Sequence, residues 1–596
     1  MEEIKETERD HREFGPALVS SPSTSSHNPD DKTSDLEKNP KVEIEYSDPE
    51  LRGDDTVTLK TWVVVVVLAM SYGISFWPVS FFSIIQSQMA VELGERAAEG
   101  AWVTAAYSLS GTIAFMVCGA NSDLFGRRAF ILGGNVLVLI GSILGGTAHS
   151  LRQIIAAQAF LGFGGGNCQI AAFALPELLP NKWRHIGVVI ADAGIYVDLI
   201  MGPVVSRIAF ANNAWRWGYW GVTISQGISF VLLLSLYFPP KHPRGIPWDR
   251  ALRDLDYVGM VSFIAAASMI VCGIVYVQLR PANSPIVVGL LVAGFTSLII
   301  FALWETFNKK LKEPLTPTRL FTANKGRTLT APFICSFIAC MFYYATNYTW
   351  PTMISVYFTN TSTPRSTINW LSTVQGFGTM AGGALLALLG KYIGHWRWQM
   401  GIPITLMTFF GAMAAYVTPE RQDLGICFAF LCSTFYGYSQ YLSITWVQFG
   451  AEQTELGIAG GLAGVARYAG GAVAVTTFST IMLTAQTSYA NTHVVAAAEA
   501  AGASADTANA VLAALPMGAA ALEKIPGLTP AIAEAAGSAF VQSWVEGVKK
   551  VAFSSIGFGS VAIIACFFLE DIGPKMNNRI EVFLENDTQA QKNVYH

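Results

Sequence analysis

The stretch Gly119-Ala-Asn-Ser-Asp123-Leu-Phe-Gly126-Arg127-Arg128 is a short charged loop between two long apolar runs, 101–120 and 129–148. Each run is about 20 residues long, which is enough for one helix to cross the hydrocarbon core of a bilayer. The glycines permit a tight turn, and the arginines are typical of a loop that stays on the cytoplasmic side. The stretch therefore predicts two membrane-spanning helices joined by a tight, positively charged hairpin.

The composition of the whole chain agrees with a membrane protein. Of 596 residues, 52% are hydrophobic and only 13% are charged, whereas soluble domains carry roughly 25% charged residues. The net charge of −4 gives no sign of a nucleic-acid partner. All eight cysteines fall within apolar runs, where they are expected to pack as small hydrophobic residues. No Cys/His cluster has metal-ligand spacing, so we expect no metal and no cofactor.

Near-continuous apolar windows predict fourteen spans. We expect an all-α integral membrane fold that divides as six, two and six spans. The windows are 61–83, 101–120, 129–148, 153–175, 186–209, 217–238, 257–277, 285–305, 328–348, 368–390, 399–418, 424–447, 456–483 and 550–569.

The domain boundaries follow from these windows. Residues 1–60 are polar and Ser-rich and predict a disordered cytoplasmic tail, after which the first span acts as an uncleaved membrane signal. Segment 485–547 is Ala-rich but interrupted by prolines and charges, so we predict an outer loop with short amphipathic helices. The predicted units are a six-helix half at 61–238, an inner loop with two linker helices at 239–305, a cytoplasmic loop at 306–327, a second half at 328–569 and a cytoplasmic tail at 570–596.

Lys and Arg in the short loops predict the orientation. The alternate loops that would be inner carry clusters such as Arg127-Arg128 and Lys309-Lys310, whereas each short outer loop carries a single basic residue. Both termini are therefore expected in the cytoplasm. Asn360-Thr-Ser then lies outside, as a candidate glycosylation sequon.

Ionisable residues inside predicted spans are candidate functional sites because they are costly in a membrane. Asp198 lies roughly 18 Å into span 5 and Asp192 roughly 9 Å, so Asp192 is the better candidate for a structural role. Arg467 in span 13 needs a partner. For Asp198 and Arg467 we weigh a proton- or substrate-linked role against a fixed structural ion pair. The stripe of Asp198 with Gly194 and Gly202 predicts close packing on another helix.

Aromatic and amide side chains on a few spans predict a cavity for a flat, apolar organic molecule, with packing and an interfacial aromatic belt as the alternative. The candidates are Tyr72, Trp77, Asn167, Gln169, Tyr344, Tyr348, Tyr436 and Tyr441.

The hairpin resembles the signature loop of the major facilitator superfamily, whose Gly, Asp, Gly and two basic positions match Gly119, Asp123, Gly126, Arg127 and Arg128. Asp123 is expected to accept hydrogen bonds at the start of span 3, and the arginines to pair with it or with carbonyls at a helix end. Such contacts would hold the cytoplasmic side shut. The alternative is that the loop serves as an orientation signal only.

Fourteen spans resemble the drug:proton antiporters of that superfamily, and four segments resemble the fungal trichothecene efflux pump family. The resemblance implies export of small organic compounds in exchange for protons, with spans 1, 4, 9 and 12 lining a central cavity. The segments are Gly164-Gly-Gly-Asn-Cys-Gln-Ile-Ala-Ala-Phe-Ala-Leu-Pro-Glu-Leu-Leu-Pro-Asn-Lys-Trp-Arg184, Val189-Ile-Ala-Asp-Ala-Gly194, Gly461-Leu-Ala-Gly-Val-Ala-Arg-Tyr-Ala-Gly-Gly471 and Leu569-Glu-Asp-Ile-Gly-Pro-Lys-Met-Asn-Asn578.

Three departures concern proton coupling. The span 5 motif keeps Gly202-Pro203, but Ser206 and Arg207 stand where paired glycines are expected. The superfamily's span 4 arginine aligns with Gln158, and the span 1 aspartate is missing from Met70-Ser-Tyr-Gly-Ile-Ser75. A proton site would therefore have to come from Asp192, Asp198 or Glu452.

These observations favour a transporter over other classes. No phosphate-binding Gly-x-x-x-x-Gly-Lys-Ser/Thr loop occurs, which argues against an ATP-driven pump, and no clustered catalytic set suggests an enzyme. We expect a monomer that exports small organic compounds across the plasma membrane, with a vacuolar or endosomal membrane as the alternative. The rival function is proton-coupled uptake of an iron–siderophore complex.

Overall fold

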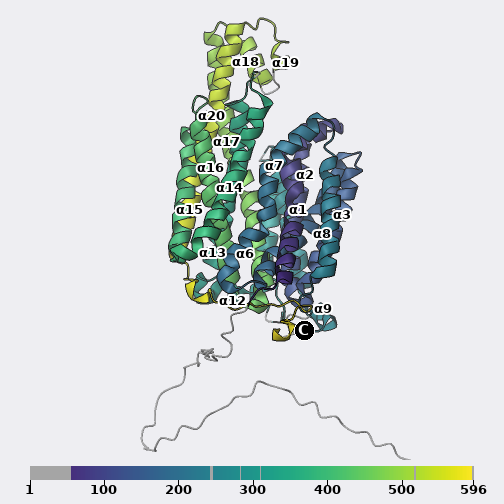
Figure 1. Ribbon diagram of the computed structural model, residues 1–596. Coiled ribbons are helices and arrows are strands. Elements are labelled where there is room, and N and C mark those ends of the chain that lie inside the picture. The colour runs from purple at the N-terminus through teal and green to yellow at the C-terminus, as the bar shows by residue number, and fades with distance from the viewer. Residues whose placement is uncertain are drawn as a thin grey trace, which may run out of the picture. The chain divides into compact units, whose positions relative to one another are not determined.

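The computed structural model describes residues 56–241, 246–281, 283–308, 310–360, 362–515 and 519–593. Residues 1–55, most of the predicted N-terminal tail, lie outside these ranges. Within them the regular secondary structure is helical, from α1 to α20 (Figure 1).

The N-terminal half begins at α1. The side chain of Thr58 caps this helix by accepting a hydrogen bond from the Thr61 N–H. The spans predicted at 153–175 and 186–209 are each interrupted, the first between Cys168 and Ala171 and the second at Asp192. The helices of this half are α1 (Leu59–Glu92), α2 (Ala101–Phe125), α3 (Arg127–Gly146), α4 (Leu151–Cys168), α5 (Ala171–Glu177), α6 (Arg184–Ala191), α7 (Ala193–Ala211) and α8 (Trp217–Leu236).

A linker and the C-terminal half follow. The linker contains α9 (Trp248–Asp254), α10 (Tyr257–Leu279), α11 (Pro285–Phe307) and α12 (Thr318–Thr322), with α10 and α11 paired and α10 against α2. The second half contains α13 (Thr330–Val356), α14 (Arg365–Ile393), α15 (Trp396–Met413), α16 (Gln422–Phe449), α17 (Leu456–Ala500), α18 (Ala505–Ala514), α19 (Ala519–Leu522) and α20 (Pro530–Phe567).

The two halves repeat one packing pattern. In the first, α1 packs on α7 and α8, α2 on α4, and α3 on α4 and α8. In the second, α13 packs on α17 and α20, α14 on α16, and α15 on α16 and α20. Between the halves, α2 lies against α17 and α7 against α14. Such an internal repeat is the architecture of secondary transporters that rock around a site between two halves.

Each of the fourteen predicted windows overlaps one α-helix or, at the interrupted spans 153–175 and 186–209, two consecutive α-helices. By length and composition, ten helices in the described residues qualify as membrane spans, or eleven if the bent pair Thr318–Gly326 and Thr330–Val356 counts as one. The helices α4, α15 and α16 are not among them. The number fourteen therefore stays a prediction.

The prediction of an outer loop with short helices at 485–547 is wrong over most of its length. Helix α17 continues unbroken to Ala500, and α20 already starts at Pro530, so both run past the predicted span ends. They project together with α18 and α19 at one end of the molecule (Figure 1). A separate apolar cluster that includes Val494, Val511 and Ile532 holds this projection together.

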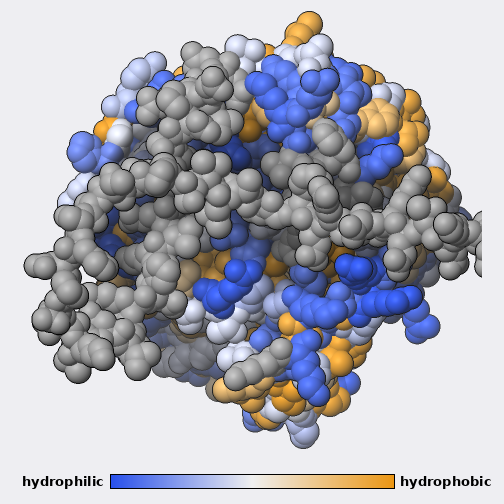
Figure 2. Space-filling view, turned by 90° about the horizontal axis from the view of Figure 1, so that it is seen from below, coloured by the Kyte–Doolittle hydropathy of each residue, from blue (hydrophilic) through white to orange (hydrophobic). Residues whose placement is uncertain are grey.

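The loops predicted to be cytoplasmic meet at the opposite end, around the C-terminal segment 569–593. Backbone hydrogen bonds join this segment to both halves, from Glu570 to Arg327, from Lys182 to Asn577 and from Glu585 to Phe238. Figure 2 looks at this end and shows many hydrophilic residues there. The side of the membrane that this end faces stays a prediction.

Candidate functional site

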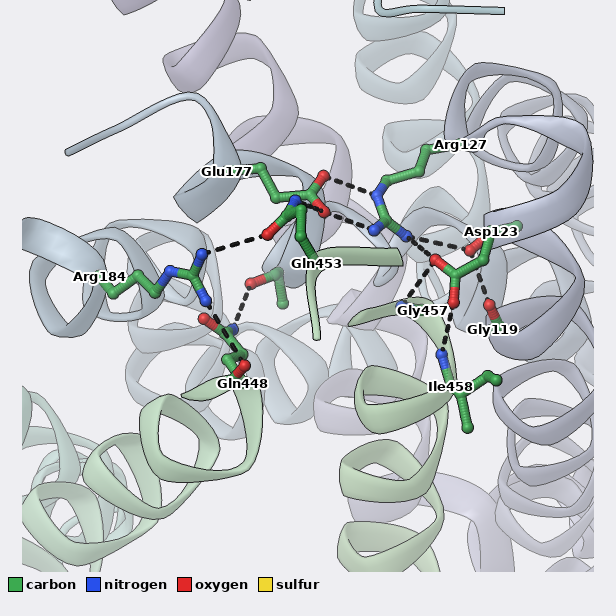
Figure 3. A network of polar contacts seen from close by, with 11 residues as sticks. Gly119, Asp123, Arg127, Glu177, Arg184, Gln448, Gln453, Gly457 and Ile458 are labelled. Atoms are coloured by element: carbon green, nitrogen blue, oxygen red, sulfur yellow. Dashed lines mark hydrogen bonds and ion pairs between the residues drawn. The ribbon is translucent and has the colours of Figure 1, made fainter. Parts of the chain in front are cut away.

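Asp123 joins the two halves at this predicted cytoplasmic end. It lies in the last turn of α2, and its carboxylate reaches the start of α17, where the first backbone N–H groups have no partner within the helix. Its Oδ1 accepts from the Gly457 N–H at 2.8 Å and its Oδ2 from the Ile458 N–H at 3.0 Å (Figure 3). A helix N-terminus favours an anion, so these contacts stabilise the closed interface. The sequence predicted an anion near a helix start but did not indicate that the helix belongs to the other half.

Arg127 connects Asp123 to a second carboxylate. Its Nη1 lies 3.2 Å from Asp123 Oδ1, its Nε donates to Glu177 Oε2 at 2.7 Å, and its Nη2 also pairs with Glu177. All three residues are buried. Gly126 makes the turn between them with φ +85°, a conformation that side chains disfavour. Glu177, from α5, was not among the predicted site residues, because only the fold brings it to this loop.

Further polar contacts extend this network into the second half (Figure 3). Gln453 donates to Glu177 at 2.8 Å, and Arg184 donates to the Gln453 side chain at 3.3 Å. Arg128 stands apart from the network. It donates to the Leu234 carbonyl at the end of α8 at 2.8 Å and lies 3.9 Å from the centre of the Phe238 ring, as expected of an arginine that pairs with a helix-end carbonyl.

Gly119 lets α2 and α17 approach closely just beyond this network. A Cβ added at Gly119 would lie 2.8 Å from the Gly461 Cα, closer than a side chain tolerates. The small residues of the two helices therefore form the packing surface between the halves.

A small cavity lies between the two halves, above this closed end. Its volume of about 30 Å³ holds little more than one water molecule. It is lined by Phe76, Gln169, Asp192, Ile195, Leu199, Cys340, Tyr343, Tyr344, Thr379, Tyr436, Tyr441, Arg467 and Tyr468. Five of these side chains are tyrosines, and the only charged ones are Asp192 and Arg467.

Arg467 crosses the cavity from the second half to the first. Its Nη2 lies 3.5 Å from Asp192 Oδ2, and its Nη1 donates to the Tyr72 hydroxyl at 2.7 Å. Asp192 occupies the break between α6 and α7 and is almost fully buried. The partner that Arg467 needs is thus Asp192, the residue for which depth alone predicted a structural role.

Of the predicted cavity residues, the structure places Gln169, Tyr344, Tyr436 and Tyr441 at the cavity wall and Tyr72 directly behind it. Sequence reasoning missed Phe76, Cys340 and Thr379 as wall residues, because they carry no signal beyond an apolar helix. It also missed Asp192 as a wall residue. Helices α7, α14 and α17 line the cavity in addition to the four expected spans.

Other predicted residues lie elsewhere. Asn167 packs against α3 at Gly134, and Tyr348 packs on an apolar cluster of the second half. Trp77 and Asp198 line a separate cavity on the side of the first half. Glu452 is exposed before the start of α17, so it is not a buried proton site.

The span 5 motif contacts α1 and α14. A Cβ at Gly202 would lie 2.8 Å from the Ser80 Cβ, and one at Gly194 would lie 2.7 Å from the Gly73 Cα, so the predicted glycine stripe packs on α1. Pro203 lines a crevice between the halves on the far side of the central cavity. Arg207 donates there to Ser372 of α14, which joins the halves at their other end.

Asn360 is exposed between α13 and α14 and accepts hydrogen bonds from the Ser362 and Thr363 hydroxyls at 2.7 and 2.8 Å. Thr361 of the sequon lies outside the described residues. Glycosylation stays a prediction.

Comparison with known proteins agrees with this architecture. The sequence profile of the fungal trichothecene efflux pump family matches residues 66–596. The chain belongs to this family. It is 39% identical over 531 residues to the MFS-type transporter prx5 of Penicillium rubens, with 88% of this chain and 94% of that one covered. It is 25% identical to the trichothecene efflux pump TRI12 of Fusarium sporotrichioides, with 81% of each chain covered.

The fold also matches a solved structure, the human organic anion transporter MFSD10 (TETRAN). The TM-score is 0.51 at 12% identity, covering 85% of this chain and 99% of that one. Membership of the family and this fold make the chain a multi-pass membrane transporter of the major facilitator superfamily, as the signature loop predicted.

Proposed function

We propose that this transporter exports small hydrophobic or amphipathic organic compounds, such as a toxin, drug or secondary metabolite, in exchange for protons. The observation that carries the proposal is the central cavity. Its wall combines five tyrosines with a single ion pair that joins the two halves. Rigid rings with polar tips bind flat apolar molecules without demanding one hydrogen-bond pattern.

The size of the cavity supports alternating access. Sites for drug-sized molecules measure about 300–1,000 Å³, whereas this cavity measures about 30 Å³. Contacts between the halves lie on both sides of it, at Asp123 on one side and at Arg207 and Ser372 on the other. A substrate would enter only when one set of contacts opens. We propose fourteen spans with both termini in the cytoplasm, so that the Asp123 network closes the cytoplasmic side.

Asp192 is the best candidate for the proton site. It is buried, it lies at the cavity wall, and its partner Arg467 belongs to the other half. Protonation of the carboxylate removes its attraction to Arg467. The guanidinium then keeps only its hydrogen bond to the Tyr72 hydroxyl. Because a buried charge without a partner is costly, the protonated state favours separation of the halves at this point. Asp198 and Glu452 lack this position at the interface.

The direction of transport is proposed from the relatives. Several related proteins are described as efflux transporters, among them TRI12 and aclA of Aspergillus oryzae. The rival function is proton-coupled uptake of an iron–siderophore complex. A large polar solute needs more polar groups than this wall offers, which favours an apolar substrate.

The test compares cells with and without the protein for accumulation of labelled trichothecenes and ferric siderophores at two external pH values. Lower toxin accumulation, lost when a protonophore dissipates the gradient, is the expected result. Higher siderophore-iron accumulation would replace export with uptake. A tagged copy of the protein in the same cells shows in which membrane it resides, and we expect the plasma membrane. After extraction from the membrane, we expect the tagged protein to be a monomer.

A further inference from the structure

A second cavity, of about 250 Å³, lies in the N-terminal half and is lined by α1, α7 and α8. Helices α7 and α8 scarcely touch each other and each packs on α1 instead, so the gap between them faces away from the central cavity. Its walls include Trp77 and Phe81 of α1 and Trp217 of α8. On α8, Gly221 is exposed, and a Cβ added there would meet nothing within 4 Å. The cavity is therefore open toward the surrounding lipid.

Among the described residues, Asp198 supplies the only charge in this cavity. Its side chain is 6% exposed, and Oδ2 is buried with no hydrogen-bond partner among the described residues. No Lys, Arg or His in the described part of the chain contributes to the wall. A buried carboxylate without a partner is costly, so the site is incomplete without a positive group.

Depth excludes a lipid headgroup as that positive group. Asp198 lies 13 residues before the end of α7 at Ala211, which corresponds to about 20 Å along the helix. The start of α6 at Arg184 lies 14 residues before Asp198, about 21 Å in the other direction. Asp198 is therefore near the middle of the roughly 30 Å hydrocarbon core, where no headgroup resides. A proton alone would satisfy the carboxylate but would leave the aromatic walls unexplained. Tryptophan and phenylalanine faces attract organic cations.

We propose that this lateral cavity binds a lipophilic organic ammonium ion that enters from the membrane, with Asp198 as its counter-ion and Trp77, Phe81 and Trp217 around its apolar part. The site is separate from the central cavity, which α7 lines with Ile195 and Leu199 on another face. It adds a class of ligand to the proposed function and does not depend on it.

The test measures binding of radiolabelled benzyltrimethylammonium to the full-length protein in lipid nanodiscs, with empty nanodiscs as background. This probe is permanently charged and small enough for the cavity. We expect saturable binding that Asp198→Asn and Gly221→Leu, which fills the cavity, each weaken by about tenfold or more. The neutral isostere neopentylbenzene should not displace the probe. Gly227→Leu is the matched control, because a Cβ there meets only Leu139, at 3.8 Å.

Unchanged binding in both Asp198→Asn and Gly221→Leu, with melting temperatures like the wild type, would overturn the proposal, as would displacement by neopentylbenzene. Absence of saturable binding to a protein that still exports a neutral toxin would also overturn it, and would leave the central export function standing.

Discussion

Asp192 and Arg467 form the charged pair at the centre of the transporter, and we expect Asp192 to decide proton coupling. Asp192→Asn keeps the shape of the side chain but removes the charge that Arg467 contacts at 3.5 Å. Toxin efflux from energised vesicles should fall by at least tenfold and lose its dependence on the proton gradient, while the amount of protein in the membrane stays similar.

The control for Asp192→Asn is Glu452→Gln, which removes a carboxylate that is exposed at the predicted cytoplasmic surface. Its efflux should match the wild type at every pH. If Asp192→Asn retains gradient-driven efflux, the proton site lies elsewhere and the assignment of Asp192 is wrong.

The buried network around Arg127 makes a prediction about stability. Removing one member of a buried charge pair costs about 3–5 kcal/mol, because the remaining charge has no partner. Arg127→Gln leaves both Asp123 and Glu177 without their cation, so its melting temperature in detergent should drop markedly. Arg128→Gln, which loses a carbonyl contact and a ring contact at a less buried position, should cost only about 1 kcal/mol. Equal losses in the two variants would contradict the role of the network.

The residue types of this site were readable from the sequence, but their partners were not. The motif identified Asp123 and Arg127, and the cost of charge in a membrane identified Asp192 and Arg467. Arg467 lies 275 positions after Asp192 in the chain, so only the fold shows that they meet. Depth along span 5 favoured Asp198 over Asp192 as the functional residue. Depth does not show which face of a helix points to the interface between the halves, and Asp192 is the one that meets Arg467 there.

At the scale of elements, the C-terminal segment 569–593 lies across the predicted cytoplasmic end and contacts both halves. Asp587 accepts hydrogen bonds from Thr58 and Thr61 at the start of α1, and Lys575 donates to the Phe449 carbonyl at the end of α16. Although partial burial raises the pKa of Asp587, hydrogen bonds from Thr58 and Thr588 hold it below its ordinary value. The carboxylate contact thus persists at neutral pH and weakens only as the pH falls through that lowered pKa.

We expect this segment to depend on its buried apolar residues. Leu584→Ala removes a side chain that is 1% exposed, which should cost about 2–5 kcal/mol and loosen the segment. Limited proteolysis of membranes should then cleave the C-terminus faster than in the wild type. Gln591→Ala, at an exposed position of the same segment, should leave the cleavage rate unchanged. Equal rates for Leu584→Ala and the wild type would show that the segment is not held by this contact.

Apolar windows located the helices well but not their ends. A predicted window stops where the hydropathy falls. Helices α17 and α20 continue beyond the predicted spans because they bury Val494 and Ile532 in one shared apolar cluster. Alanine-rich helical stretches can extend into water when tertiary contacts support them. The same reason explains why the predicted outer loop is mostly helix.

At the scale of the whole molecule, two helix pairs join the halves, one on each side of the central cavity. A Cβ at Gly119 of α2 would lie 2.8 Å from the Gly461 Cα of α17, and a Cβ at Gly376 of α14 would lie 2.8 Å from the Ile200 Cγ1 of α7. Gly119 lies four residues before Asp123, which joins the halves at one end, and Gly376 lies four residues after Ser372, which joins them at the other. Each glycine therefore permits the halves to close at one end. A larger side chain at either position should prevent closure there and favour the state that is open at that end.

We therefore predict that Gly119→Val and Gly376→Val expose Cys340 to opposite sides of the membrane. Both substitutions are made in a variant that retains Cys340 as its only cysteine. Cys340 lines the central cavity and is 1% exposed in this closed arrangement. A membrane-impermeant thiol reagent should label it from the cytoplasmic side in Gly119→Val and from the outer side in Gly376→Val, and both variants should lose transport because one state is barred. Gly133→Val, where a Cβ meets nothing within 4 Å, should label and transport like its parent. Labelling from the same side in both variants would rule out closure at two separate ends, because a rocking transporter must expose its centre to each side in turn.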